Sequence, residues 1–234
     1  NDTITGGQGA DSVFGEEGSD RFVWTTGDGV DSIEGGSGTD VLDYSDSGSI
    51  TVDQSGAIVL VNTVETSDLE WIDVDVSSSA GADTVTLVGT SDDDAVSLVG
   101  TANVRVSGLA VTVDVLGTAA NDTIAIQGSN GSDSLELEGI ADIVVDLAAG
   151  SVLNAATATV TYQGIENLDV AAGSGAALTL SGSGSYVLTT GGTLDSGLLE
   201  TDTVEIAYRD YGAGTTLTID SDLTVQTGGD DDTL

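Results

Sequence analysis

A nine-residue pattern repeats near the amino terminus and restricts the fold more than any other feature of the chain. The consecutive segments GGQGADSVF (residues 6–14) and GEEGSDRFV (residues 15–23) share glycine at the first and fourth positions, aspartate at the sixth and an apolar residue at the eighth. GGSGTDVLD (residues 35–43) follows the same frame, and TGDGVDSIE (residues 26–34) departs from it at the first position. NDTIT (residues 1–5) fits the end of one further unit.

The spacing within each unit predicts a six-residue turn followed by a three-residue strand. Glycine adopts positive φ values and keeps side chains out of the turn, so main-chain carbonyls can point inward together. The aspartate adds a carboxylate to these carbonyls. Such a set of oxygens suits Ca²⁺, which takes six to eight oxygen ligands in flexible geometry.

The apolar eighth position predicts a thin core on the opposite side of each strand. Two units then complete one coil, so we expect Asp2 to lie over Asp20 and Asp20 to lie over Asp40. The residues at the eighth position are Ile4, Val13, Phe22, Ile33 and Leu42.

These units resemble the RTX, or haemolysin-type, calcium-binding repeat, whose nonapeptides form a parallel β-roll. The resemblance covers residues 1–45, about one fifth of the chain. It implies several bound Ca²⁺ ions, export by type I secretion and folding on contact with external calcium. The ligands that it implies, carboxylates from aspartate and main-chain carbonyls from glycine, are Asp2, Gly7, Gly9, Asp11, Gly18, Asp20, Gly29, Asp31, Gly36, Gly38 and Asp40.

Two further candidate calcium ligands lie outside the repeats. GSNGSDSLE (residues 128–136) fits the nonapeptide frame with Asp133 in the ligand position, and the final DTL places Asp232 where the opening DTI places Asp2. The SDDDAV segment contains Asp92, Asp93 and Asp94 but lacks the glycines, so we expect a solvated acidic corner there.

The remainder of the chain consists of short alternating segments that begin with aspartate and end with glycine. Asp83 and Asp94 precede two such segments, and Asp122 and Asp133 precede two more, each 39 residues further on. We interpret this period as two coils of about twenty residues each. Proline, which commonly protects edges in sandwiches, is absent. Trp71, in an alternating segment, is expected in the core.

The predicted fold class is therefore all-β. A parallel β-roll of RTX nonapeptides (residues 1–45) continues into a right-handed parallel β-solenoid rich in Gly, Ser and Thr (residues 46–226), and residues 227–234 begin a further RTX-like repeat. A β-roll followed by a β-sandwich is the alternative.

The charge balance excludes several classes of function. The chain has 40 acidic and 3 basic residues, a formal net charge of −37, and no His or Cys. Nucleic acid and anionic membranes attract basic clusters, which this chain lacks, and no apolar run approaches the roughly 20 residues of a membrane span. Any export signal lies outside the segment. Without Lys or His, a polysaccharide lyase or a serine nucleophile lacks its usual base. We therefore predict no enzymatic activity.

Two functions fit these features. The first is a calcium-stabilised structural module of a secreted bacterial cell-surface protein, in a surface layer, a filament or an adhesin array. The alternative is a calcium-triggered folding and secretion module appended to a type I-secreted enzyme or toxin.

The expected partners are neighbouring copies of the chain in a tandem or head-to-tail array. We expect the two ends to be cut faces of one longer solenoid, with calcium bridging Asp232 of one unit and the opening coil of the next; the alternative is a segment that was simply trimmed at Gly-rich points. Cell-surface polysaccharide is a further candidate partner. The YRDY residues 208–211 form either a small sugar-binding or partner-contact patch or, in the favoured interpretation, a local contact in which Arg209 stacks on a tyrosine or pairs with Asp210.

Overall fold

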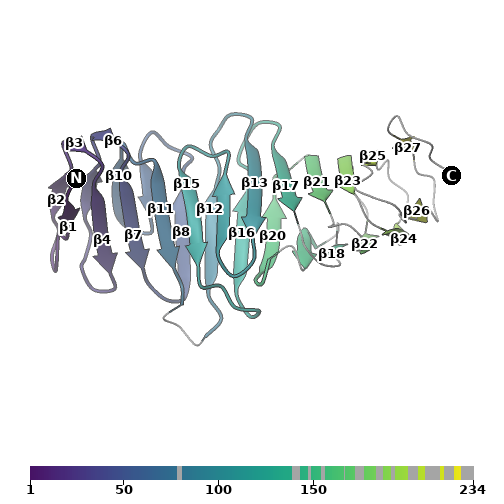
Figure 1. Ribbon diagram of the computed structural model, residues 1–234, viewed down its shortest axis with the longest axis horizontal. Helices are drawn as coiled ribbons and strands as arrows, with labels where there is room; N and C mark the ends of the chain where they lie inside the picture. Colours follow the sequence, from purple (N-terminus) through teal and green to yellow (C-terminus); the bar gives the residue numbers. More distant parts are fainter. Residues whose placement is uncertain are drawn as a thin grey trace.

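The computed structural model describes residues 1–77, 81–138, 143–146, 149–153, 156–165, 167–171, 177–182, 187–190, 193–199, 205–208, 217–218 and 224–227. Their regular elements are all β-strands, stacked one after another along the long axis of an elongated molecule (Figure 1). No helix in these residues is long and apolar enough to cross a membrane.

Most strands belong to two long sheets. The first sheet has the order β1 (Thr3–Ile4), β4 (Arg21–Thr25), β7 (Val41–Ser45), β11 (Trp71–Asp75), β15 (Thr112–Leu116), β14 (Val104–Ser107), β13 (Ala95–Gly100), β17 (Ser134–Glu138) and β21 (Asn167–Ala171). The second sheet has the order β2 (Ser12–Phe14), β5 (Ser32–Glu34), β10 (Val64–Ser67), β9 (Val59–Val61), β8 (Ser49–Asp53), β12 (Thr84–Val88), β16 (Thr123–Gln127), β20 (Thr159–Gln163), β19 (Ser151–Leu153), β18 (Ile143–Asp146), β22 (Ala177–Gly182), β24 (Thr193–Leu199) and β26 (Leu217–Thr218).

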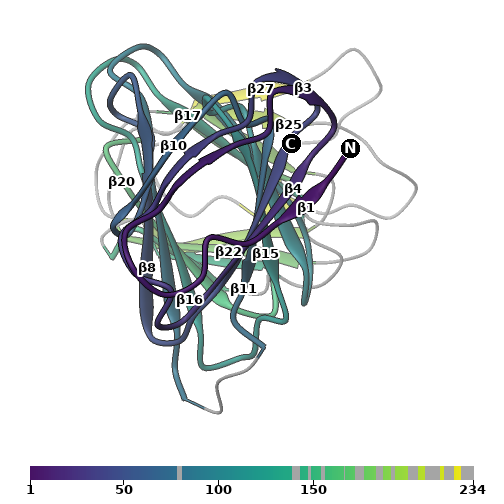
Figure 2. The same cartoon turned by 90° about the vertical axis from the view of Figure 1, so that its left-hand side faces the viewer.

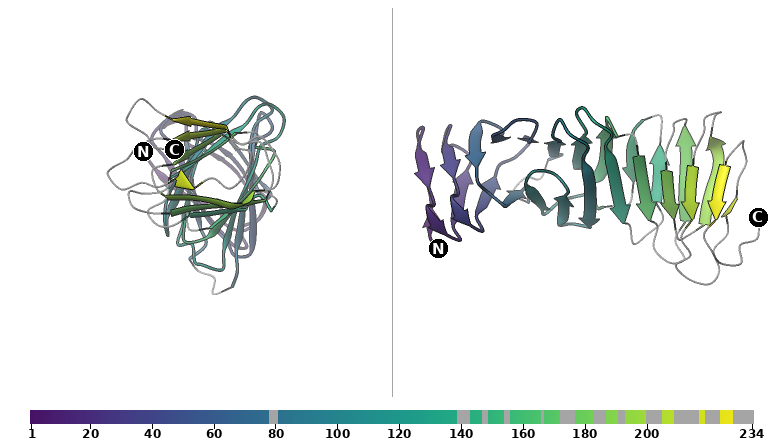
Figure 3. Two further views of the ribbon diagram at one scale, coloured as in Figure 1. Left: turned by 90° about the vertical axis from the view of Figure 1, so that its right-hand side faces the viewer. Right: turned by 90° about the horizontal axis from the view of Figure 1, so that it is seen from above.

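Two small sheets complete the described strands. One contains β23 (Val187–Thr190), β25 (Glu205–Tyr208) and β27 (Thr224–Thr227), and the other pairs β3 (Glu17–Gly18) with β6 (Ser37–Gly38). Viewed along the long axis, β8 and β16 of the second sheet lie opposite β1, β4 and β15 of the first (Figure 2). The view from above shows successive strands side by side along the molecule (Figure 3).

The core lies between the two long sheets because alternate side chains of each strand point inward. In-register parallel pairing places Phe22 beside Leu42, Leu42 beside Ile72, and Ile72 beside Val113. All four are buried, so each side chain contributes about 1.5–3 kcal/mol of burial free energy. The eighth-position prediction is confirmed, since Phe22, Ile33 and Leu42 are buried and Ile4 and Val13 pack against the core.

The predicted parallel roll and solenoid are confirmed. Strand β7 of the repeats pairs in parallel with β11 over five residue pairs, from Val41 opposite Trp71 to Ser45 opposite Asp75. Strand β11 pairs in the same way with β15. The first sheet therefore runs from the nonapeptide repeats into the following segment without a break.

The interpretation of the 39-residue period as two coils is wrong. Thr84 pairs directly with Thr123, 39 residues later, and Ala95 pairs with Ser134, so the period is a single coil. The extra length lies in β13, β14 and β15, which pair antiparallel and turn the chain back within the first sheet. In the nonapeptide repeats, by contrast, Arg21 pairs with Val41, 20 residues later.

Similar antiparallel triplets occur in the second sheet, at β8–β10 and β18–β20. The tight connections within the triplets of both sheets use residues with positive φ, which hairpin turns favour. Asn62, between β9 and β10, has φ +52°, and Gly108, between β14 and β15, has φ +91°. The triplets thus alternate between the two sheets along the chain.

Trp71 does not lie in the core, contrary to the sequence-based expectation. Its neighbour Ile72 and the next alternate residue, Val74, are the buried members of β11. Alternation therefore turns Trp71 outward, where its indole N–H donates to Asp114 Oδ2 at 3.1 Å and the Arg105 guanidinium lies 4.6 Å from the ring centroid.

Candidate calcium site: the aspartate ladder

An aspartate stands immediately before each of five strands in the nonapeptide repeats, and these aspartates stack from coil to coil. Asp20 Oδ1 accepts the main-chain N–H of Asp2 at 2.5 Å, and Asp40 Oδ1 accepts that of Asp20 at 2.7 Å. On the other sheet, Asp31 Oδ1 accepts the N–H of Asp11 at 2.9 Å. The predicted order of Asp2 over Asp20 over Asp40 is confirmed. We call these residues, with the aspartates that precede later strands in the same way, the aspartate ladder.

The second oxygen of several ladder carboxylates is buried and lacks a partner. Asp20 and Asp40 are 2% and 0% exposed. Their Oδ2 atoms, and that of Asp11, have no hydrogen-bond partner among the described residues. Burying an ionised carboxylate without compensation is costly. The amino-terminal ammonium lies 3.3 Å from Asp20 Oδ1, but the ion pairs of the described residues include neither Asp11 nor Asp40, so these two carboxylates require another nearby positive charge. A calcium ion between the turns fits that requirement.

The predicted glycines have the backbone geometry that the repeat requires. Two of them also mark the closest approach between coils. A Cβ at Gly29 would collide with the carbonyl oxygen of Gly9, and a Cβ at Gly38 with that of Gly18. The stacked turns therefore place main-chain oxygens next to one another. Positive φ values occur at Gly7, Gly9, Gly18, Gly29, Gly36 and Gly38.

The chemistry of the site is that of oxygen ligands supplied mainly by the main chain. The described residues contain no group of three or more His, Cys, Asp or Glu side chains that could hold a metal. A bound calcium ion would thus take its carboxylate oxygens from Asp11, Asp20, Asp31 and Asp40 and its remaining ligands from the turns. Bound calcium supplies positive charge between coils, and the roll supplies the stacked oxygens.

Asp133 lies in a second pair of stacked turns, outside the repeats. Ser129 of this turn donates its hydroxyl to the Gly89 carbonyl at 3.1 Å. Asp133 is 1% exposed, and its Oδ1 accepts the N–H of Asp94 at 2.8 Å. Its role as a calcium ligand stays a prediction. Asp232 lies outside the described residues.

The expected solvated corner at residues 92–94 is wrong for one of its members. Asp92 and Asp93 are exposed, but Asp94 is 6% exposed and belongs to the ladder. Sequence reasoning also missed the ladder roles of Asp83 and Asp122. The signal that identifies all three is an aspartate directly before a strand.

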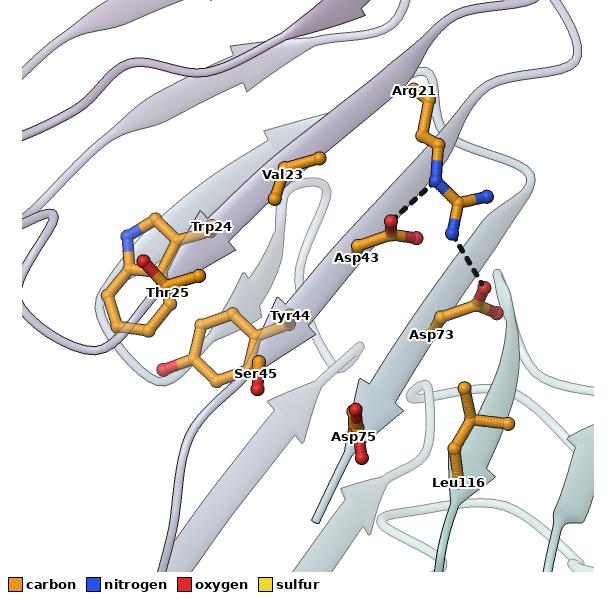
Figure 4. Close-up of a pocket in the computed structure, with 10 residues that line it drawn as sticks. All are labelled: Arg21, Val23, Trp24, Thr25, Asp43, Tyr44, Ser45, Asp73, Asp75 and Leu116. Carbon is orange, nitrogen blue, oxygen red and sulfur yellow. Dashed lines mark hydrogen bonds and ion pairs between the residues drawn. The ribbon is translucent and has the colours of Figure 1, made fainter. Parts of the chain in front are cut away.

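A separate row of charged side chains crosses the outer face of the first sheet (Figure 4). Asp43, Asp73 and Asp114 are in register on β7, β11 and β15. Arg21 pairs with Asp43 at 2.5 Å, and Arg105 pairs with Asp114 at 2.8 Å. Two of the three basic residues of the chain thus pair with this row of three aspartates, which leaves one negative charge in excess.

The members of this row differ in their protonation equilibria. Burial, together with the neighbouring charges of Asp43 and Asp114, raises the pKa of Asp73. Burial also raises the pKa of Asp43, although Arg21 opposes that change. The hydrogen bonds from Arg105, and secondarily from Trp71, lower the pKa of Asp114.

We expect Asp73→Asn to raise the melting temperature at neutral pH. A carboxyl whose folded-state pKa is raised stabilises the fold below its unfolded pKa and loses that contribution as pH rises through the folded pKa. Removing its charge at neutral pH should therefore add a few tenths to about 1 kcal/mol, the range of exposed charge pairs. Asp114→Asn should lower the melting temperature, since it removes the acceptor of Arg105. Thermal unfolding at saturating calcium measures both, and equal losses in the two variants would contradict this account.

Of the YRDY patch, only Tyr208 lies within the described residues, so binding of polysaccharide there stays a prediction.

Comparison with known families identifies the amino-terminal segment. The family model of the RTX calcium-binding nonapeptide repeat matches residues 1–23 and 25–46, with four copies. No curated protein matches the chain. Proteins with these repeats are generally exported by type I secretion and are extracellular. Residues 1–46 are therefore calcium-binding RTX nonapeptide repeats, and they make up about one fifth of the chain.

Proposed function

We propose that the chain is a calcium-stabilised structural module of a bacterial cell-surface assembly, such as a surface layer, a filament or an adhesin array. The observation that carries the proposal is the continuity of the first sheet from the RTX roll into the solenoid. Asp40, the last RTX ladder residue, donates its N–H to Glu70 Oε2 at 2.7 Å, just before β11. Calcium that orders the roll therefore also orders the first coil beyond it.

The net charge supports an extracellular structural role. A charge of −37 opposes compaction through self-repulsion unless cations neutralise it. Extracellular calcium provides such neutralisation, whereas a protein at lower calcium would keep the repulsion. The module would thus become rigid only after it reaches the outside of the cell.

The proposed partners are further copies of the same module in head-to-tail contact. β1 and β2 are edge strands of their sheets in the described residues, and exposed Asp2 precedes β1. Unpaired edges favour the addition of strands from another chain. The carboxylate of Asp2 occupies the place in the ladder at which an added coil would donate its N–H.

The proposal includes no catalytic activity. A pocket of about 240 Å³ lies beside the charged row, lined by Trp24, Tyr44, Asp73 and their neighbours (Figure 4). Ligand pockets are usually larger, roughly 300–1,000 Å³. Trp24 and Tyr44 stack on one another with ring centroids 4.3 Å apart, so the pair serves packing within the roll.

Calcium should drive linear association of the purified chain. Light scattering and electron microscopy, with calcium and with EDTA, measure this directly. We expect Asp2→Ala to reduce association, because it removes the carboxylate at the exposed end of the ladder. Asp93→Ala, at an exposed position outside the ladder, is the matched control.

A strictly monomeric chain at high calcium and high protein concentration would contradict the array. It would favour the second candidate, a calcium-triggered folding and secretion module attached to an enzyme or toxin. The confinement of the RTX match to residues 1–46 is the observation that favours this alternative.

A further inference from the structure

The aspartate ladder continues beyond the RTX repeats with the same use of Oδ1. Gly48 donates its N–H to Asp83 Oδ1 at 2.6 Å, and Asp83 donates its own N–H to Asp122 Oδ1 at 2.9 Å. Asp94 and Asp133 form the corresponding pair in the first sheet. The positions along the ladder therefore differ not at Oδ1 but at the second carboxylate oxygen.

Two of these later aspartates have Oδ2 occupied by a donor from their own turn. Asp94 Oδ2 accepts the Thr90 N–H at 2.8 Å, and Asp122 Oδ2 accepts the Ala119 N–H at 2.6 Å. Neither has glycine two residues earlier, where Asp92 and Ala120 stand instead. Their carboxylates are satisfied by protein donors and require no cation.

Asp83 differs from both and resembles the RTX aspartates. It is 2% exposed, and its Oδ2 is buried with no hydrogen-bond partner among the described residues. In the ladder, Asp11, Asp20 and Asp40 share this unpartnered Oδ2. Gly81 stands two residues before Asp83, as Gly18 stands before Asp20.

We propose that Asp83 binds a further calcium ion, outside the RTX repeats. The buried Oδ2, which has no hydrogen-bond partner among the described residues, provides the anionic ligand. Both oxygens of Asp122, the next ladder carboxylate, already accept N–H groups, so the proposed ion takes its one carboxylate from Asp83. A site with one carboxylate is weak, in the range of about 10⁻⁴–10⁻³ M that extracellular calcium modules show.

The competing explanations for the bare oxygen are a proton on Asp83 and a buried water molecule. Both predict that an amide in place of the carboxylate is tolerated and that the number of bound calcium ions is unchanged. Calcium binding predicts the loss of one ion. The number of calcium ions bound by the variant therefore distinguishes calcium binding from the two competing explanations.

The test compares Asp83→Asn with Asp94→Asn in the full chain, by native mass spectrometry and by thermal unfolding at increasing calcium. Asp83→Asn should bind one calcium ion fewer than the wild type and should lose part of the calcium-dependent rise in melting temperature. Asp94→Asn should keep the full count and should lose stability equally with and without calcium. An unchanged count in Asp83→Asn would overturn the proposal.

Hydrogen exchange of the wild-type chain gives a second readout, which also serves if the variant does not fold. The amides of Gly48 and Asp83 should gain protection with calcium in a saturable manner. The amides of Thr90 and Asp94 should be protected equally with and without it. Calcium-independent protection of Gly48 and Asp83 would likewise overturn the proposal.

Discussion

Removal of calcium is expected to unfold residues 1–46 while residues 81–138 keep their strands. In the roll, Asp20, Asp31 and Asp40 are 2%, 4% and 0% exposed, and the Oδ2 atoms of Asp20 and Asp40 lack partners. Each buried carboxylate without a cation costs several kcal/mol. The thin core of the roll, about 1.5–3 kcal/mol for each buried side chain, cannot offset several such costs.

The solenoid is expected to survive because its core is larger and two of its ladder carboxylates are satisfied by their own turns. Asp94 and Asp122 accept N–H groups from Thr90 and Ala119. The buried apolar residues of this part are Val85, Leu87, Val96, Leu98, Val104, Val106, Val111, Val113, Val115, Ile124, Ile126, Leu135 and Leu137.

Trypsin cleavage can compare the calcium dependence of the roll and of the solenoid. Trypsin cleaves after Lys and Arg, and the chain contains three arginines and no lysine. Arg21 in β4 and Arg105 in β14 have side chains that are both 54% exposed. In EDTA, cleavage after Arg21 should accelerate strongly, and cleavage after Arg105 should stay slow. Circular dichroism should show a partial loss of β signal. If the rate of cleavage after Arg21 were the same in calcium and in EDTA, folding of the roll would not depend on calcium.

Much of the RTX roll could be predicted from the sequence, because each nonapeptide encodes one turn and one strand. The glycine and aspartate offsets predicted which residues stack, and the hydrogen bonds from Asp2 to Asp20 and from Asp20 to Asp40 confirm the order. The turn geometry of each nonapeptide determines which aspartates stack, since neighbouring coils carry the same residue types at the same positions.

The path of the chain in the solenoid could not be predicted in the same way. A 39-residue period fits two short coils as well as one coil with an antiparallel triplet, because both contain the same alternating strands. What decides between them is the partner of β13, which pairs antiparallel with β14 and in parallel with β17. Strand partners depend on long-range packing, whereas the positive φ values at Asn62, Gly108 and Gly150 belong only to the connections between the strands.

The two classes of ladder carboxylate were also missed from the sequence, although a glycine two residues earlier separates Asp83 from Asp94 and Asp122. Asp83 and Asp94 precede strands of similar sequence, TVTLV and AVSLVG. Whether Oδ2 is bare or accepts the N–H of a residue earlier in the turn depends on how that turn folds. For this reason, the expectation of a solvated acidic corner at residues 92–94 was wrong at Asp94, which is buried.

The second large effect is expected for Asp40→Asn, and this loss of stability should appear in calcium but not in its absence. Asparagine keeps an oxygen that can accept the N–H of Asp20, as Asp40 Oδ1 does at 2.7 Å, but it removes the charge. With calcium, we expect the variant to bind the ion at least about tenfold more weakly, a loss of about 1.4 kcal/mol. Without calcium, it removes a fully buried carboxylate with an unpartnered Oδ2, so the variant should be no less stable than the wild type.

Asp40→Ala and Asp93→Asn separate the contributions to this effect. Alanine leaves the buried N–H of Asp20 without an acceptor, so in calcium Asp40→Ala should be less stable than Asp40→Asn by about 1–3 kcal/mol. Asp93 is exposed and lies outside the ladder, so Asp93→Asn changes the net charge by the same amount with little expected effect on calcium-linked folding. Calcium titrations followed by circular dichroism, with thermal unfolding in calcium and in EDTA, measure all three variants. If Asp40→Asn and Asp93→Asn shift the calcium midpoint equally, bulk charge rather than a ligand at Asp40 governs the response, because each substitution removes one negative charge and keeps an oxygen that can accept an N–H from the neighbouring coil.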